Sequence, residues 1–316
     1  MPMVTVIIVN WNGGDLLRRC LSDLLRQTVP PARILVMDND SSDGSAERVA
    51  GLPGVTMRML GGNLGFAAGN NRAFAECDTE FVALLNPDAF PEPDWLEKLL
   101  AAARAYPDVA AFGSRQMAEE VDGVVDGLGD VYHLSGLVWR RGHGRSLEPS
   151  DLVPCEIFSP CAGAALYRRA ALAEVGGFDE DFFCYVEDVD LGFRLRLAGY
   201  RSLYVPDAVV HHVGSATTGG QHSDFSVYHG HRNLVWTYVK NMPGWLFWAF
   251  LPAHLLLNFV TLIHFTLSGQ GRVIWRAKRD ALTGIHGMWR KRKQLQAMRR
   301  ASLTDIWRVL DKRLIP

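Results

Sequence analysis

The first 115 residues alternate short apolar runs with amphipathic segments, and this rhythm restricts the fold more than any other feature of the chain. Residues 4–9 (VTVIIV) form a continuous apolar run, typical of a strand buried on both faces. Residues 15–26 place five leucines and a cysteine on one helical face. Strands that alternate with such helices predict an α/β fold with a mostly parallel sheet flanked by helices. The further strands expected are 34–37, 55–60, 81–85 and 109–113, and the further helices are 45–50, 67–76 and 94–105.

The rhythm changes after residue 115. Residues 116–160 hold glycine, aspartate and short aromatic-containing runs, which predict a hairpin or a mobile excursion over the sheet. Residues 161–212 return to mixed strand and helix signals. We expect a helix over 189–198 and a short strand over 202–205 that ends in a turn at Pro206-Asp207.

Composition places the chain among ordinary globular proteins. Hydrophobic residues make up 48% and charged residues 21% of its 316 residues, which excludes a wholly disordered or fibrous chain. The five cysteines are scattered and form no CxxC pair, so we expect free thiols rather than a zinc ribbon or a disulfide scaffold. The chain starts almost directly with a strand-like run, so we expect no secretory signal.

The C-terminal quarter differs from the rest in polarity and charge. Residues 241–271 carry no charged side chain, and residues 272–316 carry thirteen Lys and Arg against three Asp. The apolar run at 245–268 is a membrane candidate, and the basic segment after it favours an anionic lipid surface. A hairpin buried against the main domain is the alternative, and the basic segment lacks the aromatic pattern of a nucleic-acid site. Four residues in the apolar run weaken a membrane-spanning interpretation: Pro252, His254, Asn258 and His264.

Polar, glycine-containing loops follow four of the expected strands. They are 10–14 (NWNGG), 38–45 (DNDSSDGS), 61–66 (GGNLGF) and 86–88 (NPD). In an open parallel sheet the carboxyl ends of the strands form the ligand site, so the four loops together predict a nucleotide site. Each loop alone has a simpler explanation as a turn or a helix cap.

The chain lacks the two common glycine-rich phosphate-binding motifs. No GxGxxG follows the first strand and no GxxxxGK[ST] occurs, which argues against a dinucleotide oxidoreductase or a P-loop enzyme. A diphosphate bound at this edge needs another source of positive charge. The simplest source is a divalent cation, Mg²⁺ or Mn²⁺, held by the carboxylate of Asp88.

A second polar cluster lies at 176–191, where six carboxylates alternate with aromatic residues within twelve positions. Asp188 stands where a helix begins, and a carboxylate among aromatic side chains suits general-base catalysis. Alternatively, Glu187 or Asp188 only caps that helix and pairs with a nearby arginine. His211, in the pair His211-His212, is a candidate metal ligand or an ordinary histidine at the rim.

Six segments carry a resemblance to a known family: 4–25, 34–45, 61–73, 81–89, 161–217 and 228–233 (YHGHRN). In this order they resemble the inverting family 2 glycosyltransferases of the GT-A fold, and more narrowly the bacterial rhamnosyltransferase-like members. The resemblance covers about residues 1–240. It implies a catalytic domain over 1–240, with a nucleotide-binding half at 1–115 and an acceptor half at 116–240, followed by an apolar and then basic helical region at 241–316.

The resemblance also implies roles for single residues. Asp188 would be the catalytic base, beside Glu187, and Asp88 with His211 would hold the metal. Asn86 stands where the family's DxD motif has its first Asp, so metal ligation would rest mainly on Asp88. Asp38 would contact the nucleoside base. The full set expected to bind the nucleotide or donor sugar is Asn10, Asn12, Asp38, Asp40, Asn63, Gly65, Phe66, Asn70 and Asn86.

The implied activity is sugar transfer from a nucleotide-diphospho-sugar, with dTDP-L-rhamnose as the best guess, to a glycan or polyprenyl-diphosphate-linked acceptor. Because nucleotide sugars are cytoplasmic, we expect a re-entrant or interfacial hairpin at 242–268 on the cytoplasmic face of the cell membrane. The alternatives are an inactive sugar-nucleotide-binding protein and a sugar nucleotidyltransferase. The second would usually carry a basic loop after the first strand, and no Lys or Arg occurs there before Arg18.

Overall fold

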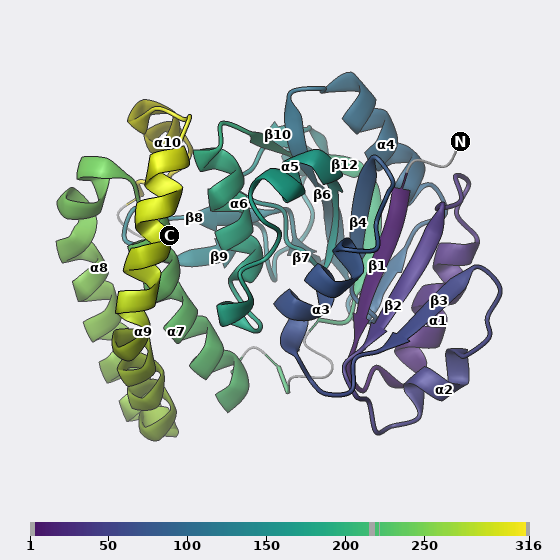
Figure 1. The fold of residues 1–316 in the computed structure, drawn as a ribbon, viewed down its shortest axis with the longest axis horizontal. Coiled ribbons are helices and arrows are strands. Elements are labelled where there is room, and N and C mark those ends of the chain that lie inside the picture. The colour runs from purple at the N-terminus through teal and green to yellow at the C-terminus, as the bar shows by residue number, and fades with distance from the viewer. Residues whose placement is uncertain (1–3, 215–218, 221, 314–316) are drawn as a thin grey trace.

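The structure is a computed structural model that describes residues 4–214, 219–220 and 222–313 (Figure 1). The end of the resemblance segment, 215–217, therefore lies outside the described residues. The strands of the main sheet are β1 (Val4–Asn10), β2 (Arg33–Asp38), β3 (Val55–Met59), β4 (Phe81–Leu85), β5 (Ala89–Pro91), β6 (Val109–Ala118), β7 (Val125–Gly127), β10 (Cys155–Glu156), β11 (Ala164–Arg168) and β12 (Arg201–His212). A separate hairpin consists of β8 (Asp130–Tyr132) and β9 (Val138–Arg140).

Helices cover both faces of this sheet (Figure 1). Side chains of α1 and α4 pack on one face, and those of α3, α5 and α6 pack on the other. Three further helices, α7, α8 and α9, stand at one end of the sheet and are followed by α10. The helices are α1 (Gly14–Leu25), α2 (Ser45–Val49), α3 (Gly65–Phe74), α4 (Trp95–Ala105), α5 (Arg169–Glu174), α6 (Glu187–Leu197), α7 (Asp224–Asn241), α8 (Gly244–Phe265), α9 (Gly271–Met298) and α10 (Leu303–Val309).

The mostly parallel sheet confirms the α/β expectation. Its order is β10-β12-β6-β11-β4-β1-β2-β3, and β3, β2, β1 and β4 are mutually parallel. Every residue of β1 is buried, as its continuous apolar run predicts. The carboxyl ends of β1, β2 and β4 therefore meet at one edge, which is where the polar loops begin.

Two strands differ from the expectation. β11 lies between β4 and β6 and is antiparallel to both, which its short segment did not indicate. β12 runs through the expected turn at Pro206-Asp207 and continues to His212. The register between β12 and β6 shifts from Val205 to Val209, and such a bulge accommodates a proline that cannot donate to the ladder.

The excursion at 116–160 contains the hairpin that its turn residues predict. β7 pairs with β6, and the β8–β9 hairpin forms a separate two-stranded sheet. Three later segments hold this hairpin in place. The Ser159 carbonyl accepts from the Asp130 N–H, the backbone of Asp311 pairs with Tyr132 and Leu134, and His254 of α8 contacts the Ser135 carbonyl.

The C-terminal region forms a helical hairpin of α8 and α9. Phe247 near the start of α8 contacts Trp289 late in α9, and Asn258 contacts Lys278 nearer the connection, so the two helices are antiparallel. The chain reverses in the π-helical turn η3 (Thr266–Gln270), where Gly269 has φ 89°. That value lies in the left-handed region that glycine adopts without strain.

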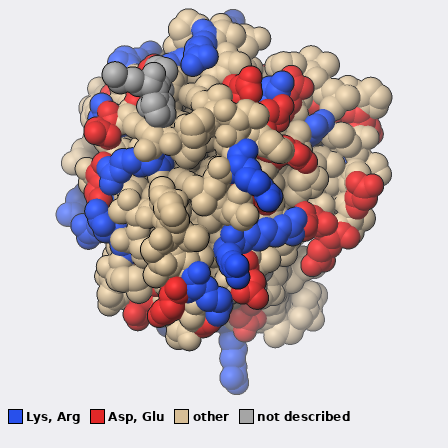
Figure 2. All heavy atoms as spheres, turned by 90° about the vertical axis from the view of Figure 1, so that its right-hand side faces the viewer, with Lys and Arg blue, Asp and Glu red and all other residues tan. Residues whose placement is uncertain are grey.

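The outward face of α8 is apolar. The helical run Gly244–Met298 is long and apolar enough to cross a membrane, and only 17% of its most apolar window is buried. The far end of the molecule, which carries α1 and α2, shows basic and acidic side chains interspersed (Figure 2). The exposed large apolar side chains on α8 are Trp245, Trp248, Leu255, Leu256, Phe259, Val260 and Ile263.

Candidate active site

A cavity of about 660 Å³ opens at the edge where the parallel strands end. Two sets of residues line it, from different parts of the chain. The first set, called here the strand-end lining, comprises Trp11, Asn39, Asn63, Phe66, Asn86 and Asp88. The second set, called here the excursion lining, comprises Asp130, Trp139, Arg140, His143, Tyr185 and Asp188.

Asn10, Asn12 and Asp38 link the first two loops beneath the cavity rather than lining it. The buried Asn10 Nδ2 donates to Asp38 Oδ1 at 2.7 Å, and Asp38 Oδ2 accepts from the Ser41 N–H at 2.9 Å. Asn12 Oδ1 accepts from the Ser42 N–H at 2.8 Å. The expected base contact, Asp38, is thus occupied by its own turn. Its neighbour Asn39 lines the cavity instead.

Asp40 and Asn70 also lie off the cavity lining. Asp40 is an exposed residue with φ 61° in the turn after β2. Asn70 is buried within α3, where its Nδ2 donates to the Phe66 carbonyl at 2.9 Å. Both residues shape the loops around the site and do not face the cavity.

Asn63, Gly65 and Phe66 do line the cavity, at the start of α3. Asn63 Oδ1 accepts from the Gly65 N–H at 3.0 Å. Gly65 has φ 83°, and a Cβ there would lie 2.6 Å from the Phe183 carbonyl oxygen. Only glycine fits this contact, which joins the third loop to the segment that precedes Asp188.

Asn86 and Asp88 occupy the tight turn between β4 and β5 and line the cavity as expected. The Asn86 N–H donates to the Gly163 carbonyl at 2.8 Å, which fixes the turn against the strand segment that leads to β11. Asp88 Oδ1 lies 3.3 Å from His212 Nε2. The Asp88 carboxylate is therefore the acidic group that the strand-end lining presents to a ligand.

The structure places His212, and not the expected His211, at the cavity. His211 points to the opposite face of β12, where its Nε2 lies 2.9 Å from Glu92 Oε1, away from Asp88. His212 faces the cavity because successive residues of a strand alternate between faces. Its Nδ1 lies 2.9 Å from Asp126 Oδ2. Burial lowers the pKa of His212, but the hydrogen bonds to Asp126 and Asp88 outweigh burial and raise it to about 9.

The donor set around Asp88 fits a divalent cation only in part. Among the described residues, no group of three His, Cys, Asp or Glu side chains surrounds one point. Asp88 and His212 Nε2 nevertheless face each other, and Asp126 holds the other ring nitrogen. A carboxylate commonly orients metal-binding histidines in this way. The remaining ligands would come from a bound diphosphate and water.

Asp188 lies in the first turn of α6 and faces the same cavity. Its Oδ2 accepts from the Ala162 N–H at 3.1 Å and its Oδ1 from the Val189 N–H at 2.8 Å. Burial raises the pKa of Asp188, while the two backbone donors oppose the rise. Glu187 is more deeply buried, and burial and the nearby Asp188 raise its pKa well above the ordinary value.

Arg194 and Arg196, the arginines that the capping alternative would pair with Glu187 or Asp188, form ion pairs with other carboxylates. Arg194 donates to Asp190 at 2.8 Å, and Arg196 donates to Glu156 at 2.8 Å. The Asp188 carboxylate accepts two backbone hydrogen bonds and also lines the cavity, a setting that suits a general base.

The excursion adds lining residues that the sequence analysis missed. Asp126 accepts from Arg140 at 2.8 Å, and the buried Asp130 accepts from Ser159 Oγ at 3.2 Å. Burial, together with the nearby Asp188, raises the pKa of Asp130 well above its ordinary value. Only the density of glycine and aspartate in 116–160 hinted at this region, because no strand pattern showed which of its residues turn inward.

The architecture is that of a GT-A glycosyltransferase. It is similar to the mannosyltransferase PcManGT from Pyrobaculum calidifontis in complex with GDP-Man and Mn²⁺, with a TM-score of 0.57 and 18% identity over 97% of this chain and 88% of that one. It is also similar to GalNAc-T7 with UDP, GalNAc and Mn²⁺, with a TM-score of 0.60 and 16% identity over 76% of this chain and 48% of that one.

Sequence comparison gives the family. The model of glycosyl transferase family 2 matches residues 5–176. The N-acetylglucosaminyl-diphospho-decaprenol L-rhamnosyltransferase of Mycobacterium tuberculosis is 32% identical over 77% of this chain and 86% of its own length. Rhamnosyltransferase WbbL of Escherichia coli is 28% identical over 65% of this chain and 81% of its own length. The chain belongs to glycosyltransferase family 2, in its rhamnosyltransferase-like branch.

Proposed function

We propose that the chain transfers a sugar, best assigned as L-rhamnose from dTDP-L-rhamnose, to a hydroxyl of a polyprenyl-diphosphate-linked saccharide, with inversion, in the synthesis of a cell-surface polysaccharide. The observation that carries the proposal is the Asp188 carboxylate at a helix start, in one cavity with the Asp88 turn. The names of two relatives support the sugar, and one of them supports the lipid-linked acceptor.

In the proposed reaction, Asp188 takes the proton of the acceptor hydroxyl as that oxygen attacks the anomeric carbon. The new glycosidic bond forms on one face of the donor sugar while the bond to the diphosphate breaks on the other face, which inverts the configuration. The electron pair leaves with the diphosphate, and the proton stays on Asp188. The Ala162 and Val189 N–H groups keep the ionised carboxylate oriented before the step.

Asp88 and His212 would hold a divalent cation, Mg²⁺ or Mn²⁺, whose bound form neutralises charge that develops on the departing diphosphate. His212 must be neutral to act as a ligand, so its proton would leave on metal binding. Asp126 would keep the imidazole oriented through Nδ1. The turn at Asn86 keeps Asp88 at the cavity through its bond to Gly163.

The acceptor would bind along the excursion lining. Trp139 of β9 offers an aromatic face to a sugar ring in the same cavity as Asp188. The turn of that hairpin contacts α8 through the Ser135 carbonyl, 2.7 Å from His254 Nδ1. The hairpin thus connects the proposed acceptor site with the helix that carries the apolar face.

We place the enzyme at the cytoplasmic face of the membrane, with α8 lying at the lipid surface. The exposed side chains of α8 are apolar except for His264 near its end, and two tryptophans stand at its start. Tryptophan is typical of the interface between lipid and water. A hairpin of α8 and α9 keeps both the catalytic domain and the basic helix on the same side.

The test is a donor screen on full-length protein with a short-chain prenyl-diphosphate-linked N-acetylglucosamine acceptor and with Mg²⁺ or Mn²⁺. Release of nucleoside diphosphate is measured for dTDP-rhamnose, UDP-sugars and GDP-mannose, with Asp188→Asn beside the wild type. Acceptor-dependent release from one donor, with an inverted product and loss in the variant, is the expected result.

Three outcomes would contradict the proposal. Nucleotide binding without release from any donor would favour an inactive binding protein. Formation of a sugar nucleotide from a nucleoside triphosphate would favour a nucleotidyltransferase. Full activity of Asp188→Asn would show that the Asp188 carboxylate is not the general base.

A further inference from the structure

The segment that leads into Asp188 has an unusual backbone. Phe183, Tyr185 and Val186 all have positive φ, at 65°, 66° and 68°. The left-handed region is unfavourable for residues with a side chain, most of all for a β-branched valine. Other parts of the molecule must therefore hold this segment, called here the base loop (183–186), in its conformation.

Asn233 of α7 binds the base loop directly. Its side chain is fully buried, and its Nδ2 donates to the carbonyls of Phe182, Cys184 and Tyr185 at 3.0, 3.0 and 2.7 Å. Its Oδ1 accepts from Arg232 Nε at 2.9 Å. The two N–H bonds of one amide are thus shared among three carbonyls of this irregular segment.

Arg232 supports the same segment from the next position of α7. Its Nη2 donates to the Asp181 and Phe182 carbonyls at 3.1 and 2.9 Å. Both residues belong to the YHGHRN segment at 228–233, which marked the resemblance but to which the proposed chemistry gives no role. The structure brings this segment to the base loop although about fifty positions separate them in the chain.

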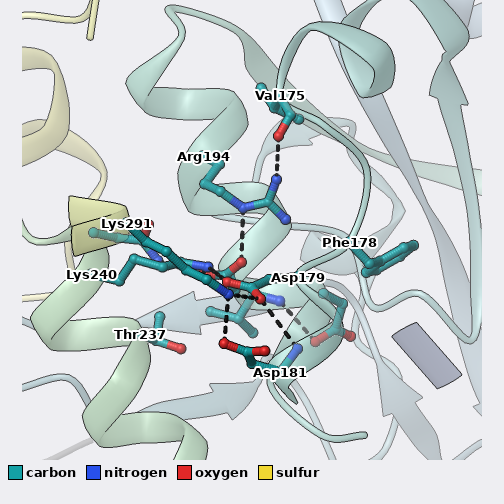
Figure 3. Close-up of polar contacts among 12 residues, drawn as sticks. Val175, Phe178, Asp179, Asp181, Arg194, Thr237, Lys240 and Lys291 are labelled. Carbon is teal, nitrogen blue, oxygen red and sulfur yellow. Dashed lines mark hydrogen bonds and ion pairs between the residues drawn. The ribbon is translucent and has the colours of Figure 1, made fainter. Parts of the chain in front are cut away.

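An ion-pair network from α7 and α9 holds residues 179–181, which lead into the base loop (Figure 3). Lys291 of α9 contacts Asp179 and lies 2.7 Å from Asp181 Oδ2. The buried Lys240 of α7 lies 2.5 Å from Asp179 Oδ2 and 2.7 Å from Asp190 Oδ1. Burial raises the pKa of Asp179, but Lys240 and Lys291 outweigh burial and hold it well below the ordinary value.

The network continues into the helix that carries Asp188. Asp190 of α6 accepts from Arg194 Nε at 2.8 Å and from Asn241 Nδ2 at 2.7 Å. Asp188 therefore lies between two fixed points, the base loop before it and Asp190 after it. Side chains of α7 bind both points, and Lys291 of α9 holds the segment just before the base loop through Asp179 and Asp181.

We propose that α7 and α9 position the catalytic carboxylate, with Asn233 and Lys291 as positioning residues for the transfer step. The inference rests on the proposed function, since it assigns these residues to the geometry of Asp188 as base. Without their contacts the base loop relaxes towards negative φ values and moves Asp188 relative to the donor. A displacement of about 1 Å at a reacting group can cost about 10²-fold in rate.

The main test compares Lys291→Gln with Lys293→Gln. The two lysines lie two positions apart on α9, but Lys291 contacts Asp179 and Asp181, whereas Lys293 is exposed. Both variants remove one charge from the same helix, so changes in lipid attraction or net charge affect them equally. Asn233→Asp is the second variant, because a carboxylate keeps the bond from Arg232 but cannot donate to the three carbonyls.

The first readout is steady-state kinetics on folded, full-length protein. Lys291→Gln should lower kcat about tenfold and Asn233→Asp about 10²-fold, with the KM for the donor unchanged. Lys293→Gln should match the wild type. Equal kcat in Lys291→Gln and Lys293→Gln would overturn the proposal, and so would an equal loss in donor affinity and kcat, which indicates general damage to the fold.

The second readout does not depend on activity. Hydrogen exchange of the amides at 183–189 should be faster in Lys291→Gln than in Lys293→Gln, with the amides of β1 unchanged. Equal exchange in the two variants would overturn the positioning role. If the wild type transfers no sugar and exchange still differs, the proposed function fails, while the effect of the Lys291 ion pairs on the base loop stands.

Discussion

The two linings of the cavity are built in different ways. The strand-end lining is held by bonds among nearby loops, such as those from Asn10 to Asp38 and from Ser42 to Asn12. The excursion lining is held from the far end of the chain, by Asn233 on the base loop and by Asp311 on the β8–β9 hairpin. Hydrogen bonds between neighbouring loops hold much of the strand-end lining, whereas contacts from the C-terminal helices hold the excursion lining.

This difference bears on how the enzyme recognises its substrates. The strand-end lining lies in loops that follow the parallel strands, and in our proposal it faces the nucleotide. The excursion lining faces the acceptor in our proposal and is tied to α8, the helix with the apolar outer face. The C-terminal helices therefore contact segments that line the cavity, in addition to carrying the apolar face.

The largest expected effect comes from Asp188→Asn. Loss of the general base should lower kcat by about 10²–10⁴-fold while the affinity for the nucleotide stays unchanged. The reason is that Asp188 belongs to the excursion lining and contacts none of the strand-end loops in its hydrogen bonds, which come from Ala162 and Val189. Calorimetric binding of the nucleoside diphosphate and single-turnover transfer measure the two quantities separately. A parallel loss of both would show that the two linings are not independent.

Ile306→Ala tests whether the excursion lining depends on the C-terminus. Ile306 of α10 is buried in a core with Tyr132 of the hairpin and Phe193 of α6. Removing its side chain should lower the free energy of unfolding by about 2–5 kcal/mol, measured by urea denaturation, and should raise the acceptor KM. Leu17→Ala, in the core under the strand-end loops, is the control that should be equally destabilising without a change in acceptor KM. An effect on acceptor KM from both variants would contradict the comparison.

The sequence predicted the strand-end lining better than the excursion lining, for a physical reason. β1 and the loop after it show their roles locally, through a continuous apolar run followed by polar residues. His212, in contrast, could be told from His211 only by the register of β12 on β6. Asp130 and Arg140 face the cavity through a hairpin held by residues near 311, and no local pattern encodes such distant contacts.

The contacts of the basic C-terminal segment also could not be predicted from local sequence. Its charge indicated a lipid-facing surface, but Lys291 pairs with Asp179 and Arg292 donates to the carbonyls of Val239 and Met242. Part of the positive charge therefore holds the fold together. The sequence placed these residues on a basic helix but could not show which side of it faces α7.

A third prediction concerns the outer face of α8. Leu256 is 62% exposed on this face, and Leu25 of α1 is 44% exposed at the other end of the molecule. Leu256→Ser should weaken binding to vesicles of phosphatidylethanolamine and phosphatidylglycerol by about 1.5–3 kcal/mol, if the leucine enters the lipid. Leu25→Ser should leave vesicle binding unchanged. Equal sedimentation of both variants with vesicles would show that this face of α8 does not bind the lipid surface.

Trp139→Ala should change the KM for the acceptor and leave the KM for the donor unchanged. Loss of the aromatic face should raise the acceptor KM about 2- to 10-fold, since stacking on an aromatic ring contributes about 0.5–1.5 kcal/mol. The donor KM should not change, because Trp139 belongs to the excursion lining. Trp139→Phe, which keeps an aromatic face, should restore most of the acceptor affinity. A rise in donor KM, or no rescue by phenylalanine, would argue that Trp139 only shapes the cavity.

The smallest expected effect is a shift in the pH dependence of kcat. Burial raises the pKa of Asp188 above its ordinary value, and a general base acts only when it is ionised. kcat should therefore fall as the pH drops through this raised pKa, so that the acidic limb lies above the range of an ordinary aspartate, about 3.9. Because the buried Glu187 adjoins Asp188, the limb belongs to the pair, and Glu187→Gln should move it while Asp188→Asn removes it from the residual rate. A limb at the ordinary value, or one that persists in Asp188→Asn, would assign the proton to another group and leave the excursion lining without its base.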